Sequence, residues 1–120
     1  MDTSKSIDEA GYVAGALIFS GRPDPVWPLE ASVSNVLLGV WDSMAQHTGE
    51  VPLAPPLGYR GCFMRAPSGI EWLAYRGVVT MTTDSDMMHR RDDHRRLERE
   101  ILKTAPEGEI PGQFLAAEFE

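Results

Sequence analysis

The segment from Ser20 to Pro28, SGRPDPVWP, combines side chains that could bind a ligand with residues that stiffen the backbone. Arg22 and Asp24 are charged, Trp27 is a large aromatic residue, and three prolines restrict the chain around them. A loop held by proline loses little entropy when it binds, so the segment predicts a contact surface for a protein or a small acidic ligand. The alternative is an Asp-Pro turn in which Arg22 and Asp24 pair with each other and Trp27 fills the core.

A second segment, LGYRG at 57–61, places an aromatic and a basic residue between two glycines. Glycine lets the backbone approach a ligand closely, and the planar guanidinium of Arg60 could hold a carboxylate or a phosphate. Tyr59 beside it completes the candidate binding set. The alternative is a strand entry with a bulge, in which Arg60 bonds to loop carbonyls. Because a βαβ order would put Arg22 and Arg60 at opposite ends of the sheet, the sequence argues against one joint site.

Three side chains that bind metals in other proteins share one face of an expected helix, at i, i+3 and i+7: Asp86, His89 and Asp93. One helix supplies too few ligands, and His47 is the further candidate from outside it. We therefore predict a solvated charged face, with no metal and no cofactor.

The sequence contains no motif of nucleophile and base and no phosphate-binding glycine loop, so the catalytic residues stay unknown. The favoured function is a non-catalytic binding or accessory domain that uses the two loops. The alternative is a small cofactor-independent enzyme with an apolar pocket on the sheet of a ferredoxin-like dimer. Its candidate residues are Arg22, Tyr59, Tyr75 and His47. A cavity lined by Trp72 and Tyr75 would favour this alternative.

The elements that position these residues follow from the hydrophobic pattern. An apolar run at 12–19 predicts a strand, and apolar spacing of three and four residues predicts a helix that Ser32 caps and Gly49 ends. Segments 59–66 and 70–81 predict two strands joined by a three-residue hairpin turn. A helix over 87–104 follows, and the tail at 113–119 is either a last strand or free.

This order matches the ferredoxin-like βαββα(β) pattern, so we expect an α+β fold with an antiparallel sheet and two helices on one face. The domain would span 11–120, after a polar and flexible segment at 1–10. A length of 120 residues, 42% hydrophobic and 24% charged, suits one globular domain.

Composition also excludes several classes of protein. A single cysteine excludes a disulfide scaffold, and the apolar runs are too short to span a membrane. The net charge of -7 lacks the basic surface that nucleic-acid binding requires. A free thiol without a secretory signal predicts a cytoplasmic protein. The sequence leaves a homodimer open and names no substrate.

The pair SGRPDPVW at 20–27 and LGYRG at 57–61 resembles a pattern shared by a group of small bacterial and fungal proteins. The end of the expected closing helix, near 102–105, fits the same pattern, so the resemblance covers most of the chain. It implies that both loops are characteristic of the group, and it brings no activity, substrate or catalytic residue.

Overall fold

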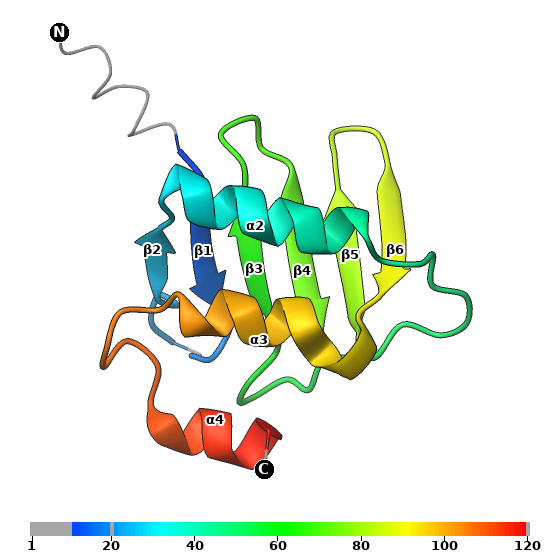
Figure 1. The fold of residues 1–120 in the computed structure, drawn as a ribbon. Helices are drawn as coiled ribbons and strands as arrows, with labels where there is room; N and C mark the ends of the chain where they lie inside the picture. Colours follow the sequence, from blue (N-terminus) through cyan, green and yellow to red (C-terminus); the bar gives the residue numbers. More distant parts are fainter. Residues whose placement is uncertain (1–10, 20, 120) are drawn as a thin grey trace, which may run out of the picture.

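The helices and strands in Figure 1 come from a computed structural model that describes residues 11–19 and 21–119. In chain order they are β1 (Val13–Ala16), β2 (Val26–Pro28), α2 (Ala31–Asp42), β3 (Cys62–Arg65), β4 (Glu71–Tyr75), β5 (Val78–Thr82), β6 (Met87–Arg91), a 3-10 turn (Asp93–Arg95), α3 (Arg96–Lys103) and α4 (Gly112–Phe119).

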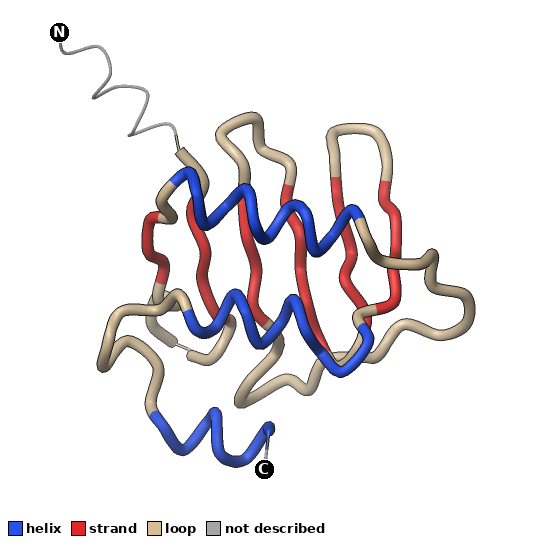
Figure 2. The backbone as a smooth tube through the Cα atoms, in the orientation of Figure 1, coloured by secondary structure: helices blue, strands red, loops and turns tan. Residues whose placement is uncertain are grey.

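The strands form one six-stranded sheet in the order β2-β1-β3-β4-β5-β6, and every neighbouring pair is antiparallel. Helices α2 and α3 lie side by side across one face of this sheet (Figure 1). Figure 2 shows that both helices are on the near side of the strands, whereas α4 lies beyond the end of the sheet, next to α3. The molecule therefore has two layers, and its core lies between the sheet and these two helices.

Alternation along the strands sends every second side chain into the space between the two layers. The buried set comprises Ala14, Ala16, Trp27, Cys62, Met64, Trp72, Ala74 and Val79 on the strands and Leu37, Val40, Trp41, Leu97, Ile101 and Leu102 on the helices. In one row across the sheet, Trp27 lies opposite Ala14, which lies opposite Met64. At this side of the sheet the small Ala14 thus lies between the large Trp27 and Met64, which can fill the space above it.

An aromatic ring closes part of the sheet face that α2 and α3 do not cover. Phe63 lies between two residues that face the helices, so its own side chain points to the other face, yet it is only 4% exposed. Its ring lies over Gly15, the residue opposite it on β1. A Cβ atom on Gly15 would lie 2.5 Å from Phe63 Cζ and 2.7 Å from the Pro25 carbonyl oxygen. Position 15 therefore requires glycine for close approach.

The expected α+β class, with an antiparallel sheet and helices on one face, is confirmed. The ferredoxin-like order is not what the chain adopts, because it has more strands than βαββα(β). One of them, β2, lies in the segment that the prolines predicted to be irregular. The expected strand at 70–81 is a hairpin, since the chain turns at Arg76 and Gly77, whose φ values are 46° and 94°.

The helix expected over 87–104 is wrong in its first part. Residues 87–91 form β6 against β5, and α3 begins only at Arg96. His94 and Arg95, with φ values of 58° and 55°, turn the chain between the strand and the helix. The tail expected as a strand or a free end at 113–119 lies in α4.

Two other local predictions hold better. The expected helix is present and spans Ala31–Asp42, but Ser32 does not cap it, because the N-cap position is Glu30, and the helix ends well before Gly49. The hairpin between β3 and β4 closes as expected, with the Gly69 N–H donating to the Ala66 carbonyl at 2.9 Å. The flexible segment expected at 1–10 lies outside the described residues.

Candidate functional site

The antiparallel pairing of β1 with β3 brings the two candidate loops to the same end of the sheet. The Leu17 N–H donates to the Gly61 carbonyl at 2.8 Å, and the Arg60 N–H donates to the Leu17 carbonyl at 2.8 Å. The expectation that Arg22 and Arg60 lie at opposite ends of the sheet was wrong, because it assumed parallel strands.

Asp24 and Arg60 join the two loops. Asp24 Oδ1 accepts hydrogen bonds from the Ile18 N–H at 2.8 Å and the Phe19 N–H at 2.7 Å. Arg60 Nη2 lies 3.7 Å from Asp24 Oδ1 and donates to the Phe19 carbonyl at 2.6 Å. Both charged groups therefore have partners inside the protein, and these contacts fix the backbone at the end of β1.

Trp27 and Tyr59 are buried beneath the loops rather than presented by them. Trp27 Nε1 donates to Thr104 Oγ1 at 2.8 Å, which ties β2 to the end of α3. The Tyr59 hydroxyl donates to the Glu98 carboxylate in the interior. Both side chains thus have structural partners, and binding by either of them stays a prediction.

Arg22 differs from the other four candidates. Its guanidinium carbon lies over the Phe19 ring, 3.7 Å from the ring centroid, and the residue is exposed. In the described part of the chain no carboxylate pairs with it within 4.0 Å. It lines a cavity of about 290 Å³ whose walls include Pro23, Pro25 and Pro111. The Arg22 side chain is therefore accessible from solvent.

A buried polar network lies below the two loops, and the sequence analysis missed it. Glu98 on α3 is fully buried and accepts hydrogen bonds from the Tyr59 hydroxyl, the Arg76 N–H and the Arg95 guanidinium. Asp92 accepts hydrogen bonds from the N–H groups of Leu97 and Glu98, so it caps the start of α3. One signal was present in the sequence: Glu98 lies three and four residues before the apolar Ile101 and Leu102, on the side of the helix that is buried.

This network suppresses the acidity of two other groups. Burial, followed by the nearby Cys62 thiol and Glu98 carboxylate, raises the pKa of Tyr59 far above its usual range. Burial and then the Glu98 carboxylate raise the pKa of the Cys62 thiol well above its usual value. Cys62 therefore stays a protonated, unreactive thiol that donates weakly to the Glu98 carbonyl at 3.4 Å.

The same arginines hold α4 in place. Glu118 Oε2 accepts hydrogen bonds from Arg76 Nε at 2.7 Å and from Arg95 Nη2 at 2.9 Å. The Phe119 ring contacts the guanidinium groups of Arg95 and Arg99, at 4.2 and 4.7 Å from the ring centroid. Hydrogen bonds from Arg76 are the largest cause of a lowered pKa for Glu118. The last turn of α4 is thus its main attachment to α3.

Acidification should release α4 before the rest of the domain unfolds. The lowered pKa of Glu118 means that its charged form stabilises docking. This contribution is complete above the ordinary carboxyl pKa of about 4.3 and is lost as the pH falls through the lowered value. Amide hydrogen exchange at Leu115 should accelerate between pH 5 and pH 3 by roughly tenfold or more relative to Leu97 in α3, after correction for intrinsic rates. Glu118→Gln should show fast exchange at Leu115 at every pH; equal exchange in both proteins at neutral pH would contradict this role.

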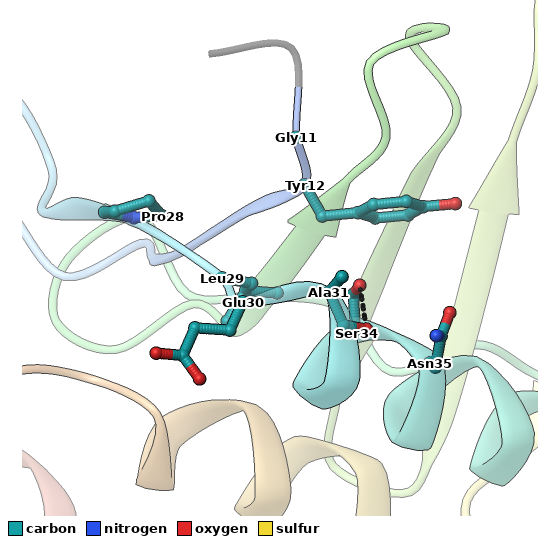
Figure 3. Close-up of a pocket in the computed structure, with 8 residues that line it drawn as sticks. All are labelled: Gly11, Tyr12, Pro28, Leu29, Glu30, Ala31, Ser34 and Asn35. Carbon is teal, nitrogen blue, oxygen red and sulfur yellow. Dashed lines mark hydrogen bonds between the residues drawn. The ribbon is translucent and has the colours of Figure 1, made fainter. Parts of the chain in front are cut away.

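A cavity of about 550 Å³ lies at the start of α2 (Figure 3). Tyr12, Leu29, Ser34 and Asn35 are among its lining residues. In Figure 3 the Tyr12 ring and the Asn35 amide face the same space, whereas the Glu30 side chain points away from Tyr12. Ser34 Oγ is already occupied, since it donates to the Ala31 carbonyl at 3.0 Å. The cavity has the size of a small-molecule site but few converging polar groups.

The remaining candidates are scattered. Tyr75 is buried near Tyr59, with the two ring centroids 6.0 Å apart. Asp86, His89 and Asp93 do not share a helical face, because they lie in a turn, on β6 and in the 3-10 turn. His47 instead lies beside His89, since its N–H donates to the His89 carbonyl at 3.1 Å.

No helix among the described residues is long and apolar enough to span a membrane. Residues 11–19 and 21–119 bring no three His, Cys, Asp or Glu side chains together as metal ligands. Comparison of the chain with protein-family models, with curated proteins and with solved structures gives no match.

Proposed function

We propose that the protein is a small binding domain that recognises a carboxylate on a partner protein or small acidic ligand through Arg22. The observation that carries this proposal is the Arg22 guanidinium, which lies on Phe19 at 3.7 Å and has no acidic partner in the described part of the chain. Stacking on an aromatic ring fixes the plane of the guanidinium and leaves its N–H groups free along the edge. A carboxylate can meet that edge through two parallel hydrogen bonds.

The surroundings of Arg22 support a preorganised site. Pro23 and Pro25 restrict the loop on one side of the cavity, and Pro111 lies on the other. Asp24, paired with Arg60, anchors the same loop to β1 and to the segment before β3. Binding would therefore order few additional groups, which lowers its entropic cost.

Glu109 restricts the chemistry of the ligand. This acidic residue lines the same cavity as Arg22. Its charge would repel a phosphate or a densely acidic ligand, whereas a single carboxylate can contact Arg22 while it stays away from Glu109. We therefore assign the cavity to a single carboxylate, such as a glutamate side chain on a partner protein. A cytoplasmic location, which the single free cysteine favours, belongs to the same proposal.

Substitution of Arg22 tests the proposal. Glutamate blocked at both backbone ends is titrated into the protein, with blocked glutamine as the uncharged control ligand, and amide NMR shifts are followed at Gly21 and Gly108. We expect Arg22→Ala to weaken binding of the blocked glutamate at least about tenfold, the value of one charge-assisted hydrogen bond. Arg99→Ala is the matched control, because Arg99 also stacks on a phenylalanine ring but lies outside this cavity.

The outcomes separate the proposal from its alternative. Equal affinity of Arg22→Ala and the wild type, or equal binding of blocked glutamine, would show that Arg22 does not read a carboxylate. The enzyme alternative expected a cavity beside Trp72 and Tyr75, but both side chains are buried in the core at 5% and 6% exposure. Their burial favours the binding proposal over a catalytic pocket on this part of the sheet.

A further inference from the structure

Two histidines lie directly opposite each other along the outer side of β6. After α2 the chain returns beside this strand, and Gln46 forms a β-bridge with Arg90. The Arg91 N–H donates to the Ala45 carbonyl at 2.8 Å, and the His47 N–H donates to the His89 carbonyl at 3.1 Å. Residues opposite each other in an antiparallel ladder point to the same face, with Cβ atoms about 5 Å apart. The His47 and His89 side chains therefore start from opposite positions on the same face.

In each imidazole, one ring nitrogen is hydrogen-bonded to an oxygen of the protein. The other ring nitrogen can then carry the lone pair. The Glu50 carbonyl lies 2.8 Å from His47 Nε2 and can only accept, so the proton of the neutral ring is on Nε2 and the lone pair is on Nδ1. His89 Nδ1 lies 2.8 Å from Thr80 Oγ1, which can accept a hydrogen bond from Nδ1–H in the tautomer that has its lone pair on Nε2. Metal-binding histidines are oriented by this kind of contact.

His47 and His89 line one cavity of about 420 Å³ together with three methionines, Met81, Met87 and Met88, and with the polar residues Gln46, Thr83, Ser85 and Asp86. Met87 is 61% exposed and Met88 is 42% exposed, which is unusual for side chains that usually fill cores. Met87 lies two residues before His89 on β6, so its thioether is on the same face as both imidazoles. Met81 and Met88 are directly opposite each other on β5 and β6.

We propose that this cavity binds a single Cu(I) ion through His47 Nδ1, His89 Nε2 and the Met87 sulfur. Thioether sulfur is a soft ligand that selects Cu(I), and imidazole also suits copper. Met81 and Met88 alternate with these positions along β5 and β6, so their side chains point to the other face of the sheet and are not among the ligands. The site shares no lining residue with the Arg22 cavity, so a test of copper binding is independent of a test of the proposed function.

A competition titration tests the site. The full chain competes with bicinchoninate for Cu(I) under anaerobic, reducing conditions. We expect one equivalent of Cu(I) to move from bicinchoninate to the protein. Met87→Leu and His89→Gln should each weaken Cu(I) binding at least about tenfold. Thr80→Val should weaken it about 10- to 100-fold although Thr80 touches no metal, because the His89 ring loses the group that orients it. His94→Asn and Met64→Leu are the matched controls, since neither residue lines this cavity.

A second measurement assigns the ligands directly. Methyl-¹³C methionine NMR with Ag(I), a soft ion without accessible redox chemistry, should shift the Met87 methyl signal and leave the Met64 signal in place. The proposal is overturned if Cu(I) affinity is unchanged in a variant that combines Met87→Leu with His89→Gln. It is equally overturned if Cys62→Ala abolishes binding, or if Zn(II) binds as tightly as Cu(I) and Met87→Leu affects neither ion.

Discussion

Replacing Glu98 with glutamine should lower the free energy of unfolding by about 3–5 kcal/mol, the usual cost of removing one partner from a buried ion pair. The Glu98 carboxylate is fully buried and faces donors on every side, from Tyr59, Arg76 and Arg95. A glutamine amide would point its own N–H₂ group at one of these donors and would leave the Arg95 guanidinium without a full counter-charge.

Urea denaturation followed by tryptophan fluorescence measures this change. Glu100→Gln is the matched control, because Glu100 lies on the same helix but pairs with Lys103 at 3.4 Å in an exposed position. An exposed pair of this kind contributes about 1 kcal/mol or less. If the two variants lose the same stability, the buried network does not hold α3 to the sheet as described.

Two glycine-to-alanine substitutions should change stability in opposite directions. Gly15→Ala should lower the free energy of unfolding by about 1–3 kcal/mol, because an added methyl group forces neighbours apart in a packed region. The conflict cannot be relieved by a side-chain rotation alone, since the new Cβ would lie 2.7 Å from the Pro25 carbonyl oxygen as well as 2.5 Å from the Phe63 ring.

Gly39→Ala is the control for this substitution. Gly39 lies inside α2, and a Cβ atom there would meet nothing within 4 Å. Alanine should therefore raise the free energy of unfolding by about 0.5–1 kcal/mol, through helix propensity alone. Thermal unfolding of the two variants beside the wild type gives both signs in one experiment. A shift in the same direction for both would refute the close approach of Phe63 to β1.

The parts of the fold that the sequence predicts well are those with a strong local pattern. The apolar spacing around Leu37 and Trp41 identifies α2, because both side chains must face the sheet together. The hairpin between β3 and β4 is also local, since its turn contains Gly69 with a φ of 99°. These signals depend on neighbours within four residues, so no tertiary information is needed to read them.

The missed elements depend on partners that lie elsewhere in the chain. The sequence Met87–Arg91 has no apolar alternation of its own and becomes a strand because β5 pairs with it. β2 has only three residues and is defined by its pairing with β1. The Arg76 turn was hidden inside an apolar run, because arginine with a positive φ is uncommon and gives no composition signal.

The candidate site shows the same division. The sequence identified both loops, but the antiparallel neighbours β1 and β3 decide that Asp24 and Arg60 meet. Because that pairing uses both charges internally, Arg22 is left as the charged group of the first loop that faces solvent. Similarly, His47 and His89 lie 42 positions apart in the printed sequence and become neighbours only through the strand register.

The ends of the sheet have a consequence for self-assembly. On one side β2 is three residues long and carries Pro28, which has no N–H to offer another strand. On the other side, hydrogen bonds from His47 and to Ala45 already occupy backbone groups of β6. Chains of this protein are therefore protected from adding strand to strand into fibrils, even though the sheet is antiparallel and open.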